Sequence, residues 1–249
     1  MTIRRTLYLL TAISAVALAG AEALLAQTTA ADVRRQIRAA TANFKDLTLD
    51  TRIDHANQRE LAVIGKDFGK AYEFKNSKLW FKAPDMVKMQ AKAGFVNVTY
   101  IITGDTKRIQ AGVIRKTDDI KEEPHKKQTA LDLGIATETI WDEFQVAYHR
   151  GDIYNGRPCH VLAINYPASP DKKEYLWIDA RDFRIWQREK READGSLRVR
   201  FVYSKHREFK NVIWVPGEVR VFNGNLKHAG TSVYTNIRVN TGISTDVFK

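Results

Sequence analysis

In four separate segments of this 249-residue chain, an apolar residue recurs at every second position. Such alternation is typical of antiparallel strands with one apolar face and one face in water. Short turn sequences at residues 103–105, 155–156, 193–195 and 223–225 separate apolar runs at hairpin distance. The sequence therefore predicts a mainly β fold built from hairpins. The alternating sets are Leu47, Leu49 and Ile53; Val87, Met89, Ala91, Ala93 and Phe95; Leu197, Val199, Phe201 and Tyr203; and Val233, Thr235, Ile237 and Val239.

Two segments have helical rather than alternating periodicity. Residues 31–46 carry apolar side chains at helical spacing, with arginines on the other side, and a second helix is expected at about 129–145. The stretch 115–128 is highly charged and contains Pro124, which predicts an exposed loop. The one-sided strands could close on each other as a sandwich, or one curved sheet could wrap around the helices. Composition leaves both arrangements open.

The N-terminus has the order of a signal peptide. Arg4 and Arg5 precede an almost wholly apolar run from Leu7 to Gly20, and small residues follow up to Ala26. The run is shorter than the ~20 residues that a membrane-spanning helix needs. We therefore expect residues 1–26 to be cleaved on export from the cytoplasm, and residues 27–249 to form a single domain.

Charge and motifs narrow the classes of function. The formal net charge of +11 favours anionic membrane surfaces or acidic cargo as partners of an exported protein, or serves solubility alone. Export disfavours nucleic acid as a partner. The single cysteine, Cys159, allows no internal disulfide. The six histidines lack the spacing of a zinc site, and hydrolase and nucleotide-binding motifs are absent. The sequence thus predicts no metal, no cofactor and no catalytic residues.

Residues 78–86, Lys-Leu-Trp-Phe-Lys-Ala-Pro-Asp-Met, resemble a strand-end motif of the LolA-like family. Similar short matches lie at Glu174–Trp186, at Ile213–Pro216 and at Val239–Ile243. Together with the order of helix, strands, central helix and long hairpins, the resemblance covers nearly all of residues 27–249. It implies an unclosed antiparallel β-barrel, with covering helices as a lid over a hydrophobic cavity for acyl chains.

One position departs from the family pattern. Lipoprotein chaperones of the family have an arginine before the motif proline, and that arginine helps to hold the lid shut. Here the position is Ala83, which cannot make the hydrogen bonds of a guanidinium group. The lid mechanism therefore does not carry over directly, and a lipidic cargo other than lipoproteins becomes more plausible.

The resemblance implies a periplasmic carrier that binds lipid or the acyl chains of lipoproteins, acts in outer-membrane lipoprotein sorting, and makes transient contact with envelope membrane proteins. Peripheral contact with the membrane is also expected. The alternative function is an envelope module that senses lipid or binds a partner without transport, and a hydrolase is disfavoured. An acyl chain gains about 0.8 kcal/mol per buried methylene, so its site should have apolar walls. The predicted lipid-binding residues, each of which could instead belong to a filled core, are Trp80, Met89, Phe95, Val98, Tyr100, Trp141, Val199, Phe201 and Val233.

Overall fold

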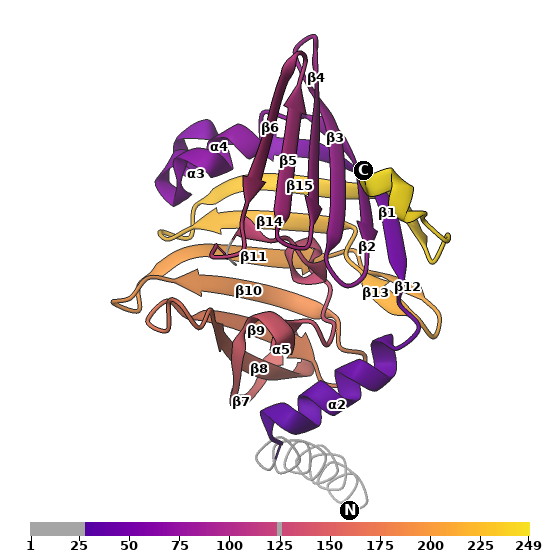
Figure 1. Cartoon of the computed structure of the whole chain (residues 1–249). Helices are drawn as coiled ribbons and strands as arrows, with labels where there is room; N and C mark the ends of the chain where they lie inside the picture. Colours follow the sequence, from indigo (N-terminus) through magenta and orange to yellow (C-terminus); the bar gives the residue numbers. More distant parts are fainter. Residues whose placement is uncertain (1–27, 124–125) are drawn as a thin grey trace, which may run out of the picture.

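The computed structural model describes residues 28–123 and 126–249, so the predicted signal peptide and Pro124 lie outside the described residues. Thirteen strands form one antiparallel sheet in the order β6-β5-β4-β3-β2-β1-β15-β14-β11-β10-β9-β8-β7 (Figure 1). The mainly β prediction is confirmed. The strands are β1 (Asp46–Ala56), β2 (Asn76–Lys82), β3 (Met86–Ala93), β4 (Val96–Thr103), β5 (Thr106–Ala111), β6 (Ile114–Asp119), β7 (Gln145–Tyr154), β8 (Arg157–Asn165), β9 (Glu174–Asp179), β10 (Ile185–Arg191), β11 (Leu197–Ser204), β14 (Glu218–Asn223) and β15 (His228–Val239).

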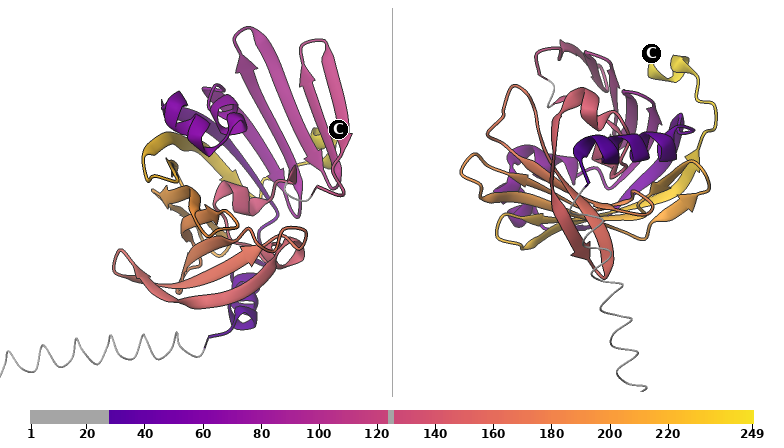
Figure 2. Two further views of the ribbon diagram at one scale, coloured as in Figure 1. Left: turned by 90° about the vertical axis from the view of Figure 1, so that its left-hand side faces the viewer. Right: turned by 90° about the horizontal axis from the view of Figure 1, so that it is seen from below.

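The sheet is curved but not closed, as predicted. Its two edge strands are β6 and β7, which do not pair with each other. Strands β2–β6 form an arm that stands away from the broad sheet of β7–β11, β14 and β15 (Figure 2). The long strands β1 and β15 join the two parts, with Leu47 opposite Val239. The short strands β12 (Arg207–Phe209) and β13 (Ile213–Val215) make a separate hairpin.

The helices differ in part from the predictions. Helix α2 (Ala30–Thr41) begins with a capping box between Thr29 and Asp32, and ends before β1 rather than at residue 46. In place of one helix at 129–145 there are two short ones, η2 (Ala130–Leu133) and α5 (Ile140–Glu143). Helices α3 (Gln58–Ile64) and α4 (Lys66–Ala71) were not predicted, and η3 (Thr245–Phe248) ends the chain. No helix of the described part has the length and apolar character that crossing a membrane requires.

The stretch 115–128 is also different from its prediction as a loop. Strand β6 occupies its first part and pairs with β5. Because β6 is an edge strand whose residues are mostly exposed, it needs no apolar alternation. The charged composition of this stretch therefore predicted its exposure correctly but did not indicate strand β6.

Candidate functional site

One face of the sheet, called here the inner face, carries the main hydrophobic core. Directly paired residues of neighbouring strands point to the same side. Across β8, β9, β10, β11 and β14 the register places in one row Leu162, Leu176, Arg188, Phe201 and Val221. This row is therefore apolar with one charged residue in its middle, and the neighbouring row of the same face adds the directly paired Glu174 and Lys190.

Residues 129–144, called here the lid, cover part of this face. Their backbone hydrogen bonds, such as that from Ile135 N to Ala130 O at 3.0 Å, join lid residues to one another rather than to the sheet. The lid is thus attached to the sheet through side chains. Its buried apolar side chains are Ala130, Leu131, Leu133, Ile135, Ala136, Ile140 and Phe144.

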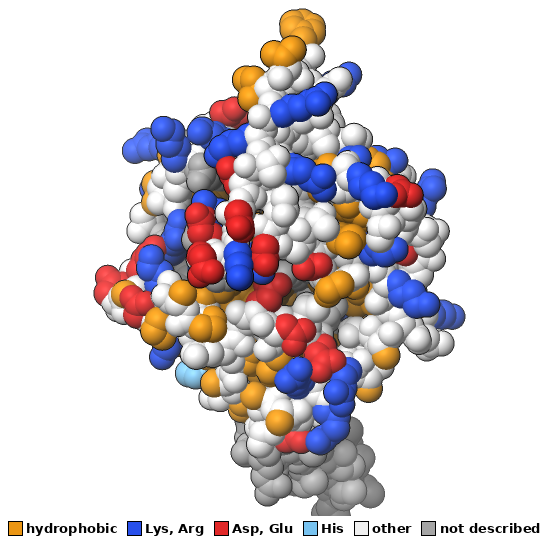
Figure 3. All heavy atoms as spheres, in the orientation of Figure 1, with side chains coloured by type: hydrophobic (Ala, Val, Ile, Leu, Met, Phe, Trp, Pro, Cys, Tyr) orange, Lys and Arg blue, Asp and Glu red, His pale blue; other side chains and the backbone are white. Residues whose placement is uncertain are grey.

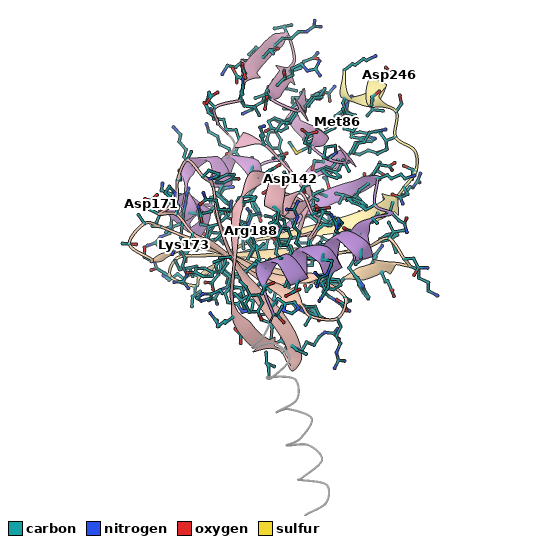
Figure 4. All side chains as sticks on the ribbon, turned by 60° about the horizontal axis from the view of Figure 1, so that its bottom comes forward. Met86, Asp142, Asp171, Lys173, Arg188 and Asp246 are labelled. Atoms are coloured by element: carbon teal, nitrogen blue, oxygen red, sulfur yellow. The ribbon has the colours of Figure 1, made fainter. Side chains whose placement is uncertain are left out.

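Arg188 links the lid to the sheet, and Figure 4 shows it toward the centre of the molecule, away from Asp171 and Lys173. The buried guanidinium group donates to Glu174 Oε2 at 2.6 Å on β9. It also donates to two lid atoms, Asp132 Oδ1 at 3.1 Å and Leu131 O at 3.4 Å. A planar fork of donors can serve both elements at once.

The charge of Glu174 is maintained by its neighbours. Burial by itself raises the pKa of this carboxyl group, but the charges of Arg188 and Lys190 outweigh burial and lower it overall. Lys190 Nζ lies 3.1 Å from Glu174 Oε1. Glu174 therefore stays ionised and keeps Arg188 in place beneath the lid.

A second set of contacts holds the lid from outside. Arg34 of α2 donates to Glu138 at 3.0 Å and lies 3.7 Å from Asp142, while Arg38 lies 3.6 Å from Glu138. These pairs are partly exposed, so each contributes little. Ala83 adjoins the same region, because it lines a hollow of about 210 Å³ together with Glu138 and Asp142.

The lid makes a close contact at Gly134, between η2 and α5. Gly134 has a φ of 77°, and a Cβ atom there would lie 2.5 Å from the ring of Tyr203 on β11. Only glycine tolerates both the backbone conformation and the contact. This residue explains why one continuous helix does not form at 129–145.

Glu143 of α5 is a titratable group within the lid. Burial raises its pKa to about 7; the negative charges of Asp132, Asp85 and Asp142 add to the rise, and Lys127 opposes it. The carboxyl group therefore changes its charge near neutral pH.

Six of the nine predicted lipid-binding residues lie on or against the inner face. Met89 and Tyr100 are directly paired and half-buried, in register with the core residue Leu79, and Val98 follows on the same side. Phe201 packs against the main core and also against a smaller apolar cluster that contains Leu61 and Ile64 of α3. Trp141 of the lid packs against the main core. Val199 is fully buried against Leu61 and Ile64 of α3, so it lies in a filled part of the face.

The other three predicted residues are placed elsewhere. Trp80 lies on the outer face with Ile243 and Phe248, away from the inner face. Phe95 lies in a hairpin turn and is fully exposed. Val233 alternates with the core residue Tyr234 and pairs with Glu218, so it points outward.

The error at Val233 has a local cause. Asn236 has a φ of 49°, and the pairing of β1 with β15 shifts register between Thr48 and Asp50. A bulge of this kind reverses the alternation along a strand. Ile237 and Val239 therefore contact the core while Val233 does not, although all three share one parity in the sequence.

Sequence reasoning missed Arg188, Glu174 and Asp132. Arg188 stands in the run Gln187-Arg188-Glu189-Lys190-Arg191, which looks like a solvated strand. The sequence pattern gave no usable signal: Arg188 has the parity of Trp186, but Trp186 packs with Trp177 on the outer face because the pairing of β10 with β9 shifts register between Ile185 and Gln187. Among the described side chains, no group of three or more His, Cys, Asp or Glu residues is placed to hold a metal ion.

The fold is similar to several solved structures. A LolA superfamily protein from Nitrosomonas europaea matches with a TM-score of 0.61 at 12% identity, over 89% of this chain and 98% of that one. A domain from Vibrio parahaemolyticus, described as an outer membrane lipoprotein-sorting protein, matches with a TM-score of 0.57 at 11% identity, over 88% and 95%. A DUF1329 family protein from Desulfovibrio piger has a TM-score of 0.51 at 12% identity, over 88% and 95%. No protein-family model and no curated protein matches the sequence.

Proposed function

The chain has a LolA-like fold, and on that premise we propose that it is an exported, non-enzymatic carrier of lipid or of lipoprotein acyl chains. The cargo lies against the inner face of the sheet, beneath the lid. Because the Vibrio parahaemolyticus relative is described as a lipoprotein-sorting protein, we extend the proposal to sorting toward the outer membrane. Loading and release involve transient contact with membrane proteins of the envelope.

The observation that carries this proposal is the way the lid is attached. Side chains hold residues 129–144 on an apolar face, and the lid's own backbone hydrogen bonds remain intact when it moves away. An acyl chain that replaces the lid restores the lost apolar burial, at about 0.8 kcal/mol per methylene.

The Arg188 contacts set a small cost for opening. Arg188 keeps its bond to Glu174 when the lid leaves, so of its own contacts it loses two hydrogen bonds, to Asp132 and to Leu131 O. The partly exposed pairs that Arg34 and Arg38 make with the lid add little. Each is worth about 1 kcal/mol net. A cargo with several methylenes can offset that cost.

Uptake of a fluorescent fatty-acyl probe tests the proposal, and native mass spectrometry of the purified protein identifies any bound lipid. Met89→Lys places a charge on the inner face and should weaken uptake about tenfold or more, since a buried unpaired charge is costly. The matched control is Gln90→Lys, one position along β3 on the outer face, which should leave uptake unchanged. Equal uptake by the two variants, or none by the unaltered protein, would contradict the proposal.

A further inference from the structure

The far end of the arm carries large apolar side chains in full contact with water. Strands β3 and β4 are joined by Gly94 and Phe95, and β5 and β6 by Gly112 and Val113. Each glycine has a positive φ, 61° at Gly94 and 58° at Gly112, which suits a two-residue hairpin turn with glycine first. This geometry turns the following side chain outward, so Phe95 is 106% exposed and Val113 is 98% exposed.

The two turns make one patch. Gly112 N donates to Asn97 O at 3.3 Å, and a Cβ atom at Gly112 would lie 3.7 Å from a methyl carbon of Val96. Figure 3 shows hydrophobic side chains at the end of the molecule where Figure 1 places the turns of the arm. We call this patch the hairpin tip: Phe95, Val96, Val113 and Ile114. A contiguous apolar patch marks an interaction site, whereas a single exposed apolar residue does not.

On the strands of the arm, the charged residues near the hairpin tip have one sign. Between Met86 and Thr117 the sequence contains one acidic residue, Asp105, which lies in the β4–β5 turn at the opposite end of these strands. Lys92 and Arg115 are exposed next to the tip. An apolar end with a basic collar matches a bilayer that contains anionic lipids, where apolar groups enter the headgroup–acyl boundary and cations meet phosphates.

A second copy of the chain fits the tip less well, because two tips in contact would bring two basic collars together. We propose that the hairpin tip inserts into the surface of bilayers that contain anionic lipids and orients the protein with its arm toward the membrane. This inference depends on the exposed tip alone and holds whether or not the inner face carries cargo.

Sedimentation with protein-free vesicles tests this inference. The chain from residue 27 onward contains all of the described fold and lacks the apolar run 7–20, which could bind vesicles by itself. We expect it to bind vesicles of phosphatidylcholine mixed with phosphatidylglycerol more strongly than vesicles of phosphatidylcholine alone. The variant Phe95→Ser/Val113→Ser/Ile114→Ser should bind the mixed vesicles at least about tenfold more weakly, because it loses three inserting side chains.

The matched control is Val63→Ser/Ile153→Ser/Leu226→Ser, which changes three apolar residues that are each about half exposed outside the tip. It should bind as the unaltered chain does. Lys92→Gln/Arg115→Gln should remove the preference for anionic vesicles, and equal melting temperatures would show that all variants fold. Undiminished binding by the tip variant would overturn the inference. Absence of binding by the unaltered chain would also overturn it and would point to a protein partner.

Discussion

At the scale of single residues, two positions determine how the lid meets the sheet. Arg188 supplies the only charge in the row of directly paired residues across β8, β9, β10, β11 and β14, and it bonds Glu174 and the lid together. Gly134 allows the lid backbone to lie against the ring of Tyr203. Arg188 bonds the lid to the sheet, whereas Gly134 leaves room for the ring of Tyr203, so the two positions are tested by different substitutions.

Arg188→Met should lower the free energy of unfolding by about 3–5 kcal/mol, since removal of one partner leaves buried polar groups unpaired. Arg188→Lys should cost less, because an ammonium group can pair with Glu174 without reaching both lid atoms. Urea unfolding measures both. The control Arg52→Met breaks an exposed pair with Asp54 and should cost far less, because water screens that pair. A similar loss for Arg52→Met and Arg188→Met would contradict the role given to Arg188.

Gly134→Ala and Gly156→Ala form a matched pair, because both glycines have a φ of 77°. A Cβ atom at Gly156 would meet nothing within 4 Å. The free energy of unfolding of Gly156→Ala should therefore fall only by the cost of placing alanine at a positive φ, about 1 kcal/mol. Gly134→Ala should lose a further ~1–3 kcal/mol from the clash with Tyr203. Thermal unfolding gives the difference, and equal losses would mean that the lid does not lie against Tyr203.

At the scale of elements, the lid is a short segment with two attachments and one carboxyl group, that of Glu143, whose pKa is raised to about 7. Arg188 holds η2 from beneath, and the arginines of α2 hold the start of α5. Glu143 sits in α5 with a raised pKa, which makes the closed position dependent on pH.

The stability of the closed lid should fall as the pH rises through about 7. Burial raises the pKa of Glu143 from 4.5 to about 7, so the folded state holds the proton more tightly than the unfolded chain does. This stabilisation is complete below 4.5, the pKa of Glu143 in the unfolded chain, and is lost above about 7, its pKa in the folded protein. Urea unfolding at about pH 5 and about pH 8 should show a smaller pH difference for Glu143→Gln than for the unaltered protein. Glu122→Gln, at an exposed position, is the control and should keep the full difference.

Ala83→Arg should slow the release of a bound acyl probe. Ala83 lines the hollow that also contains Glu138 and Asp142, so a guanidinium group there can bond lid carboxylates, at about 1 kcal/mol for each hydrogen bond. Stopped-flow release kinetics provide the measurement, and Ala83→Leu adds bulk without donors as a control. If both variants release the probe equally fast, Ala83 does not act on the lid.

At the scale of the whole molecule, the first and last strands along the chain, β1 and β15, pair with each other. The carboxylate of Asp46, at the start of β1, is buried and accepts hydrogen bonds from the backbone of Thr241 at 2.7 Å and Gly242 at 3.0 Å. Asp46→Ala should therefore destabilise the protein by about 1–3 kcal/mol, because buried donors lose their acceptor. The exposed control Asp54→Ala should cost less, and chemical unfolding compares the two.

Local chemistry predicted several of the strands, four of their turns and the start of α2, because alternation, glycine turns and helical periodicity act between residues close in the sequence. It also identified Met89, Val98 and Tyr100 as residues of one face, since β3 and β4 have no register shift between them. Only the tertiary structure decided that Val233 points outward, that α3 covers Val199, and that Arg188 meets the lid. The physical reason is separation along the chain: the bulge between β1 and β15, the docking of α3 on Val199 and the bond from Arg188 to Asp132 each join residues more than fifty positions apart, and such contacts leave no periodic trace in the sequence.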